Sequence, residues 1–131
     1  MVIDTSVLVA IVLGESTAAA LQRALRQAES RDLSAVSLLE AGIVLRTRMR
    51  AESTEILDSL IQEIDCQVVP FDEVQARTAV TAHQRYGKGQ GHRAQLNFGD
   101  CAVYALAALR GEPVLAIGND FRATDLTVVP L

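Results

Sequence analysis

The chain has 131 residues, half of which are hydrophobic, and carries a formal net charge of −4 at pH 7. That length suits a single domain over residues 1–131, and the acidic balance argues against nonspecific coating of nucleic acid, which needs many Lys and Arg contacts to phosphates. Every apolar run is shorter than a membrane span and no signal peptide is recognisable, so we expect a cytoplasmic protein.

The start of the chain predicts a strand that leads into two helices. The run at 2–4 is β-like, and the apolar segment 5–13 has helical density and ends before Gly14, a suitable C-cap residue. Residues 16–29 begin with Ser and Thr as caps and carry apolar residues at the spacing of an amphipathic helix.

The middle of the chain repeats this alternation. It predicts strands at 32–37 and 67–71, a helix with a basic C-terminal end over 37–50, and an amphipathic helix over 52–64. Asp72 can cap the next helix, which runs to a glycine-rich loop at 86–93. A largely apolar helix follows over 96–110, and two more short strands are predicted within 112–120 and 125–131.

Strands that alternate with helices in this way imply right-handed crossovers between parallel strands. The predicted fold is therefore an α/β domain, a three-layer α/β/α sandwich with a mostly parallel central sheet. Cys66 and Cys101 show neither the spacing of a zinc site nor a disulfide framework, and we expect both to be buried thiols.

Three aspartates follow strands or begin helices where such a sheet gathers its ligands. Asp4 follows the first strand and Asp120 ends the strand within 112–120, so both would face the crevice outside the carboxyl ends of the strands. Asp100 lies at the start of the apolar helix, whose free N–H groups face the same side. Each aspartate alone is equally explained by a turn or by a helix cap, which contributes about 0.5–2 kcal/mol.

Glu40 differs because it lies in the middle of a predicted helix, where neither a cap nor a turn explains it. Its neighbours Leu38, Leu39 and Ile43 favour burial, and a glutamate is almost never fully buried without a partner. The alternatives are a narrow polar stripe facing solvent, an ion pair with Arg48, or a functional site.

The predicted sheet brings these four acids together, and no lysine accompanies them in their segments. Two carboxylates 4 Å apart repel by roughly 4 kcal/mol at an effective dielectric of about 20, so the group needs protons or a cation. Mg²⁺ and Mn²⁺ prefer oxygen ligands, and such a cation can lower the pKa of a water and stabilise charge on phosphorus. The sequence therefore predicts a divalent-metal site.

Four stretches of the chain carry a family resemblance. MVIDTSVLVAIVLGE, SLLEAG, LNFGDCAVYALA and LAIGNDFRATDL resemble, in order and spacing, the PIN-domain ribonuclease toxins called VapC. The resemblance implies a magnesium-dependent endoribonuclease, with Mn²⁺ able to substitute, that hydrolyses RNA phosphodiester bonds. It also implies a homodimeric toxin of a type II toxin–antitoxin pair that cleaves tRNA or another structured RNA. A VapB antitoxin would wrap apolar surface of the toxin and direct a basic side chain at the acids.

Carried over by position, the catalytic quartet is Asp4, Glu40, Asp100 and Asp120. The resemblance implies that Asp4 and Asp100 bind the metal directly, while Glu40 and Asp120 complete the pocket, partly through waters. An acid of the quartet would place a water for in-line attack on the phosphodiester.

Residues beside the quartet are predicted to support it. The hydroxyl of Thr5 or Ser6 could orient a water or a phosphate, and Asn119 adjoins Asp120. Asp125, the acid most easily confused with Asp120, is predicted to have a structural role in a turn or at a strand start.

Basic residues near the acids are the candidates for RNA contact, with plain solubility as the alternative for each. They are Arg46, Arg48, Arg50, Lys88, His92 and Arg93. Neither His83 nor His92 has ligand spacing to another His or Cys, so neither is expected to bind metal.

Three other interpretations compete with a nuclease. An aspartyl-nucleophile phosphatase wants a second Asp two residues after the first, where this chain has Ser6. A signalling receiver domain needs a paired lysine near the last strands, and the sequence has none from Glu112 onward. A metal-binding PIN module with little turnover would keep the same acids, and a cleavage assay separates it from an active enzyme.

Overall fold

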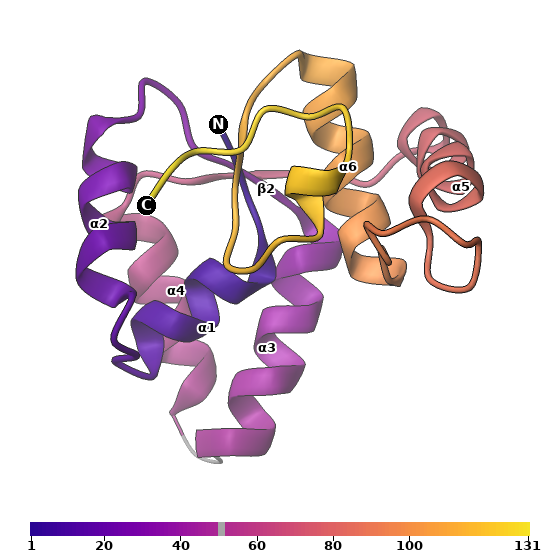
Figure 1. Cartoon of the computed structure of the whole chain (residues 1–131). Coiled ribbons are helices and arrows are strands. Elements are labelled where there is room, and N and C mark those ends of the chain that lie inside the picture. The colour runs from indigo at the N-terminus through magenta and orange to yellow at the C-terminus, as the bar shows by residue number, and fades with distance from the viewer. Residues whose placement is uncertain (50–51) are drawn as a thin grey trace.

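The computed structural model describes residues 1–49 and 52–131 (Figure 1). Strands and helices alternate along the chain, as the sequence predicts. The elements are β1 (Val2–Ile3), α1 (Thr5–Val12), α2 (Ala18–Gln27), β2 (Asp32–Ser34), α3 (Ala35–Met49), α4 (Ser53–Glu63), β3 (Gln67–Val69), α5 (Glu73–Tyr86), α6 (Phe98–Arg110), β4 (Val114–Leu115) and the 3₁₀-helix η1 (Phe121–Ala123).

The strands form one parallel sheet in the order β3-β2-β1-β4. β1 pairs with β2 on one side and with β4 on the other, and β3 pairs with β2 at the edge. Each strand is only two or three residues long. The sheet is therefore a narrow frame, and the helices supply most of the buried surface.

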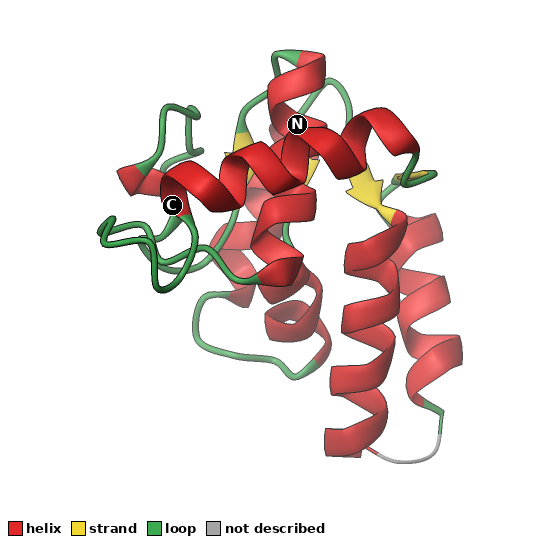
Figure 2. Ribbon diagram, turned by 90° about the vertical axis from the view of Figure 1, so that its right-hand side faces the viewer, coloured by secondary structure: helices red, strands yellow, loops and turns green. Residues whose placement is uncertain are grey.

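Side chains of successive strand residues point to opposite faces of the sheet. Ile3, Leu33 and Leu115 belong to a core shared with α1, α2, α3 and α4, whereas Val2 and Val114 belong to a second core shared with α5 and α6. Helices thus cover both faces, which confirms the predicted three-layer sandwich (Figure 2).

The two C-terminal strand predictions need correction. The strand predicted within 112–120 is confined to Val114–Leu115, and the chain then turns through Gly118, at a φ of +101°, into η1. The segment 125–131 makes a single bridge from Val128 to Val114. Because Pro130 has no N–H to donate, it cannot extend a ladder there.

Several boundaries also differ from prediction. β2 ends at Ser34 and α3 begins directly after it at Ala35, where the sequence pattern predicts more strand. α2 begins at Ala18, and the hydroxyl of its N-cap residue Thr17 makes no capping hydrogen bond. Asp72 does cap α5, since its Oδ1 accepts a hydrogen bond of 2.9 Å from the N–H of Gln75.

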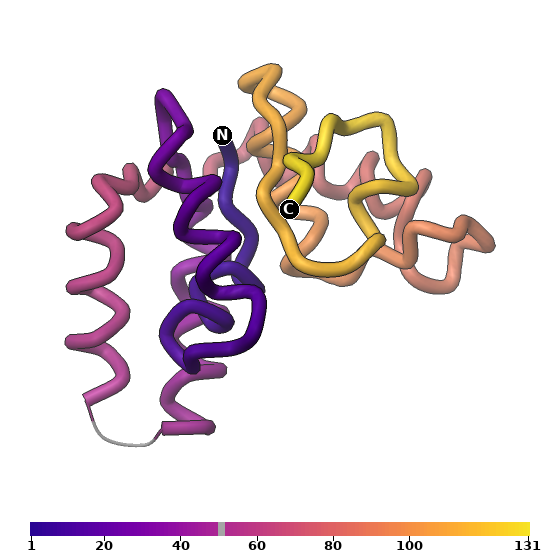
Figure 3. The backbone as a smooth tube through the Cα atoms, turned by 60° about the vertical axis from the view of Figure 1, so that its left-hand side comes forward, coloured from indigo at the N-terminus to yellow at the C-terminus, as the bar shows by residue number. Residues whose placement is uncertain are grey.

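Helices α3 and α4 pack side by side and project beyond the sheet (Figure 2). The two ends of the chain lie close together at the opposite end of the molecule, where Met1 and Leu131 line one cavity (Figure 3). No described helix combines the length and the apolar character that crossing a membrane requires. Cys101 is buried and Cys66 is partly buried, and burial raises the pKa of each thiol to about 11.

Candidate active site

The four predicted acids line one pocket of about 370 Å³, which we call the acidic pocket. Asp4 follows β1, Glu40 lies on α3, Asp100 lies in the first turn of α6, and Asp120 precedes η1. The lining is completed by Thr5, Ser6, Val9, Glu15, Val44, Arg48, Asn97 and Ile117. The structure therefore brings together the acids that the sequence separates.

Asp4 is buried, with 7% of its surface exposed, and it caps α1. Its Oδ2 accepts hydrogen bonds from the Ser6 N–H, at 2.9 Å, and from the Ser6 hydroxyl. The same hydroxyl accepts a 3.1 Å hydrogen bond from the N–H of Ile117, which ties Asp4 to the segment after β4. Burial and then the charge of Glu40 raise the pKa of Asp4, against the hydrogen bonds from Ser6 that lower it.

Asp100 takes part in a capping box at the start of α6. Its N–H donates to Oδ1 of Asn97 at 2.9 Å, and its Oδ2 accepts from the Asn97 N–H at 2.8 Å. The pKa of Asp100 is raised to about 6, first by burial and then by the charges of Asp4, Asp120 and Glu40, against the Asn97 hydrogen bond that lowers it. The other three acids therefore lie close enough to Asp100 for their negative charges to disfavour its ionised form.

The carboxylate of Glu40 lies where α1, α3 and α6 meet. Its Oε2 accepts a 2.7 Å hydrogen bond from the Thr5 hydroxyl. A Cβ atom at Gly99 would lie 2.5 Å from the same oxygen, so a side chain at this position would displace the carboxylate from its present place. Arg48 pairs with Glu15 at 3.9 Å and not with Glu40, so the ion pair considered for Glu40 does not form.

The predicted capping role is correct for Asp4, whereas the N-cap of α6 is Asn97 and Asp100 is its partner in the capping box. Both carboxylates stabilise a helix start, and all hydrogen bonds found for them in the described part of the chain involve Oδ2. Oδ1 of neither residue accepts any of these hydrogen bonds, although the backbone N–H of Thr5 also acts on the Asp4 carboxylate and lowers its pKa. None of the four acids has an ion-pair partner within residues 1–49 and 52–131. Unpaired, partly buried carboxylates are a costly arrangement unless protons or a cation relieve it.

The donor chemistry of the acidic pocket fits a hard divalent cation, because all four acids offer carboxylate oxygens and the pKa values of Asp4 and Asp100 are raised. In the arrangement seen here, no three His, Cys, Asp or Glu side chains of the described residues are close enough together to hold a metal ion. A cation bound here would contact one or two carboxylates directly and reach the other acids through water.

The predicted supporting residues fall into two groups. Thr5 and Ser6 line the acidic pocket, and each donates its hydroxyl to a carboxylate, so contact of either with a water or a phosphate stays a prediction. Asn119 is exposed and is not part of the lining. Asp125 accepts a 2.7 Å hydrogen bond from the Tyr104 hydroxyl, which lowers the pKa of Asp125 and supports its predicted structural role.

The candidate RNA contacts are scattered. Arg48 lines the acidic pocket, whereas Arg46 is exposed outside it. Lys88, His92 and Arg93 lie in the loop before α6 and do not reach the lining; the ring of His92 packs edge-on against Tyr86 at 4.9 Å. Arg50 lies outside the described residues.

Among the polar residues of the lining, sequence reasoning missed Glu15 and Asn97. A signal for Asn97 was present, because an Asn three residues before an Asp is the pattern of a capping box. Glu15 follows Gly14, where α1 has ended, and no local pattern indicates that this turn brings its carboxylate to Arg48.

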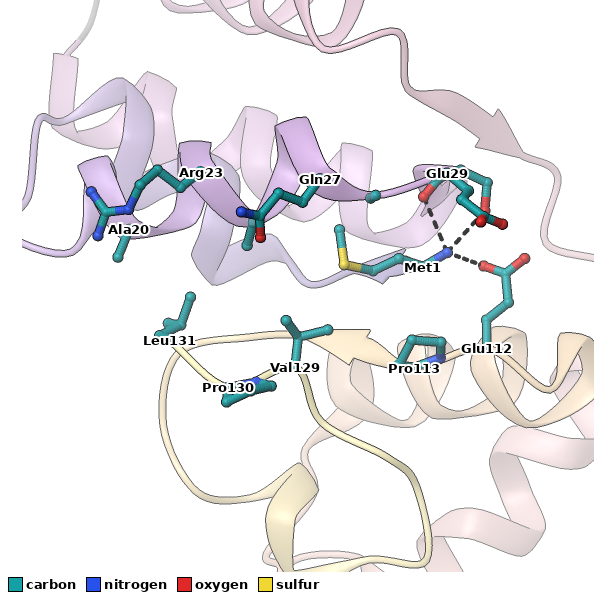
Figure 4. A pocket seen from close by; sticks show the side chains of 13 residues that line it. Met1, Ala20, Arg23, Gln27, Glu29, Glu112, Pro113, Val129, Pro130 and Leu131 are labelled. Atoms are coloured by element: carbon teal, nitrogen blue, oxygen red, sulfur yellow. Dashed lines mark hydrogen bonds and ion pairs between the residues drawn. The ribbon is translucent and has the colours of Figure 1, made fainter.

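A larger cavity of about 700 Å³ lies at the opposite end of the sheet (Figure 4). There the amino group of Met1 donates to the Ser30 carbonyl at 3.1 Å and pairs with Glu112, while Val129 and Pro130 form an apolar wall. Its buried charges are paired with each other, so it lacks the unbalanced electrostatics of the acidic pocket.

Comparison with known proteins shows the family and the fold. The PIN-domain family model matches residues 1–126. The chain is 49% identical over 124 residues to ribonuclease VapC28 of Mycobacterium tuberculosis, and the match covers 95% of this chain and 93% of that protein.

Two solved structures share the fold. One is Mycobacterium tuberculosis VapC20, described as a sarcin-ricin loop cleaving toxin, with a TM-score of 0.81, 18% identity and coverage of 98% of this chain and 97% of that one. The other is a toxin–antitoxin complex from Klebsiella pneumoniae, with a TM-score of 0.73, 16% identity and coverage of 99% and 97%.

Proposed function

The chain belongs to the PIN-domain family, in its VapC branch, and from that premise we propose that it is a magnesium-dependent endoribonuclease, the toxin of a type II toxin–antitoxin pair. The observation that carries this proposal is the acidic pocket, where four carboxylates meet with no ion-pair partner among the described residues. Relatives of high identity that are named ribonucleases support the same reaction class.

We propose Asp4 and Asp100 as the direct ligands of Mg²⁺, since Oδ1 of each accepts none of the hydrogen bonds found in the described part of the chain. When bound, the cation would supply Lewis-acid chemistry toward a phosphodiester, and Mn²⁺ could take its place. The capping hydrogen bonds at Oδ2 fix the orientation of both carboxylates, so neither side chain must be ordered when the ligand arrives.

Glu40 and Asp120 would then orient water for in-line attack. The Thr5 hydroxyl holds Oε2 of Glu40, which leaves Oε1 to accept a hydrogen bond from a water. Asp120 is exposed at the edge of the acidic pocket, where solvent and substrate can reach it. Ser6 keeps Asp4 in register with the segment that carries Asp120, because one hydroxyl bonds both Asp4 and the N–H of Ile117.

The partners follow from the same family membership. We propose that the substrate is tRNA or another structured RNA in the cytoplasm, that the toxin is a homodimer, and that a VapB-type antitoxin inhibits it. A solved neighbour in complex with its antitoxin supports that kind of partner. An antitoxin side chain with a positive charge would compete with the cation for the acidic pocket, because both would be attracted by the same carboxylates.

Cleavage of a labelled RNA panel tests this function. We expect cleavage with Mg²⁺, no cleavage with excess EDTA, and loss of cleavage in Asp4→Asn and Asp100→Asn. Asparagine is as good an N-cap residue as aspartate, so Asp4→Asn keeps the start of α1. At Asp100, the third residue of α6, asparagine keeps a side-chain oxygen that can accept from the Asn97 N–H, while the N-cap Asn97 is unchanged. Metal-independent cleavage, or full activity in either variant, would reject the proposed mechanism.

One observation favours a second candidate, a metal-binding PIN module with little turnover. Among the described residues, no three acids, histidines or cysteines lie close enough together to form a metal site from protein ligands alone. This alternative predicts that Mg²⁺ stabilises the fold while no member of the RNA panel is cut, even at high protein concentration.

A further inference from the structure

One basic side chain, that of Arg48, lines the acidic pocket. Helix α3 carries Glu40, Val44 and Arg48 at four-residue spacing, and all three line the pocket because residues at that spacing share one helix face. Two helical turns, about 12 Å along the axis, separate Glu40 from Arg48. The guanidinium of Arg48 is therefore on the same wall as the quartet but displaced from it.

Glu15 holds Arg48 at this position. Nη1 of Arg48 lies 3.9 Å from Oε1 of Glu15, and the two side chains are 58% and 44% exposed. A pair so exposed and so long contributes little to stability. It can still bias the direction of the guanidinium, which has several N–H donors, and most of these remain available to a phosphate.

The negative charge of the lining explains why an RNA substrate would need Arg48. The lining contains the carboxylates of the quartet and of Glu15, whereas Arg48 is its one basic side chain among the described residues. RNA is a polyanion, so the acids repel every phosphate except one neutralised by a cation. A phosphate flanking the cleaved bond is attracted to the pocket only where a protein cation meets it.

We propose that Arg48 binds a backbone phosphate of the RNA other than the one being cleaved, and that Glu15 is a positioning residue that directs Arg48 to it. The inference rests on the proposed nuclease function. It singles out Arg48 from the other basic candidates, since Arg46 is not part of the lining and Lys88, His92 and Arg93 lie in a loop outside it.

The binding test uses Asp100→Asn as a common non-cleaving background and a fluorescent single-stranded RNA. Adding Arg48→Gln is expected to weaken binding about 10-fold and to reduce the salt slope of log K by about 0.7, the value for one phosphate contact on a single strand. Arg48→Lys should fall between the two, because it keeps the charge and loses the planar fork of donors.

Arg77→Gln is the matched control for the loss of one positive charge. Arg77 lies on α5, is 79% exposed, pairs with Glu73 at 2.6 Å and is not part of the acidic pocket. It is expected to leave RNA affinity within about twofold of the background. Equal affinities of the Arg48→Gln and Arg77→Gln proteins would overturn the assignment of Arg48.

Glu15→Gln tests the positioning role. If Glu15 acts through Arg48, its substitution weakens binding on its own but adds nothing once Arg48→Gln is present, as a double-mutant cycle measures. Glu73→Gln controls for the loss of a negative charge. Additive effects of Glu15→Gln and Arg48→Gln would overturn the role of Glu15.

Turnover distinguishes this inference from the proposed function. In the active protein, Arg48→Gln should raise KM by a factor similar to the binding loss and leave kcat within about twofold. A fall in kcat at constant KM would overturn the inference, because it would place Arg48 at the reacting phosphate. If the wild type cleaves RNA but Arg48→Gln binds RNA as tightly as the background protein, only this inference fails. If the wild type cleaves no RNA, the nuclease proposal fails, and the binding comparison still decides whether Arg48 contacts RNA.

Discussion

The two ends of the parallel sheet hold their acids in different ways. Where the strands begin, Asp32 of β2 is 2% exposed and pairs with Arg110 at 2.6 Å, and Glu112 pairs with the amino group of Met1. Where the strands end, Asp4 is almost as buried as Asp32 and the described residues offer it no cation. Adjacent strands of one sheet thus carry a compensated aspartate at one end and an uncompensated one at the other.

This difference distinguishes a carboxylate that stabilises the fold through an ion pair from carboxylates that are available to bind a ligand. A buried carboxylate with an arginine partner is satisfied in the folded protein and needs nothing else. A buried carboxylate among other acids has a raised pKa, as Asp4 and Asp100 do, and this unfavourable charge is relieved only when a cation or a proton arrives. Uncompensated burial is therefore a better marker of the site than cavity size, since the larger cavity lies at the compensated end.

The largest expected effect comes from the same substitution at both ends. Asp4→Asn should lower RNA cleavage by more than about 100-fold and leave the free energy of unfolding unchanged or slightly higher, because the cap survives and a buried charge is removed. Asp32→Asn should do the reverse: it should lower the free energy of unfolding by about 1–3 kcal/mol through loss of the Arg110 pair and leave cleavage intact. Cleavage assays and urea unfolding measure the two responses, and parallel losses in both variants would break the comparison.

A smaller loss of cleavage is expected when a side chain is added at Gly99, next to the Glu40 carboxylate. Gly99→Ala places a Cβ 2.5 Å from Oε2 of Glu40 and should reduce cleavage by about 10–100-fold by displacing that carboxylate. Gly42→Ala on α3 is the control, since a Cβ there meets nothing within 4 Å. It should raise the free energy of unfolding by about 0.5–1 kcal/mol through helix propensity and keep activity. Normal cleavage by Gly99→Ala would show that Glu40 does not need its present position.

Metal addition should act at one end of the sheet only. At Mg²⁺ about 100-fold above its dissociation constant, mass action stabilises the folded state by about 2.7 kcal/mol, which raises the thermal midpoint by several degrees. Asp100→Asn should abolish that rise, whereas Asp32→Asn should keep it. KCl at equal ionic strength is the control for screening, and an equal rise with KCl would argue against a specific site.

The smallest expected effect is a pH dependence from Asp100. Its pKa in the folded, metal-free protein is about 6, above its usual value of 3.8, so its contribution to stability is complete below about pH 4 and is lost as pH rises through 6. We expect the free energy of unfolding of the wild type to fall by about 1–2 kcal/mol relative to Asp100→Asn between pH 4 and pH 7, less than the full shift because the side chain is partly solvated. Equal pH profiles in EDTA would contradict this. Mg²⁺ should flatten the difference, because it replaces the proton.

Much of this arrangement follows from local sequence. The alternation of apolar runs with helical patterns gives the sandwich, and acids placed directly after a strand or at a helix start give Asp4 and Asp100. Glu40 could be found because an acid in the middle of a helix, among apolar neighbours, serves neither as a cap nor in a turn. The capping roles of Asp4 and Asp100 were also predictable, and they coexist with a place in the acidic pocket.

Other features depend on contacts between distant segments and left no local signal. The predicted strand before Asp120 is cut short because the chain turns at Gly118, so Asp120 reaches the pocket from a turn. Lys88 is close to Asp100 in sequence, yet its loop leads away from the lining. The fit of Glu40 against Gly99 needs two helices in contact, which a linear pattern does not encode.

The capping box of α6 constrains how this protein could drift in evolution. Asp100 both completes the capping box of α6 and lines the acidic pocket, so most replacements would weaken the start of the helix and also remove a carboxylate from the pocket. Asparagine spares the helix and lies a single-nucleotide change away from aspartate. In relatives that are no longer selected for cleavage, we therefore expect Asp100 and Asp4 to be replaced by asparagine more often than by alanine.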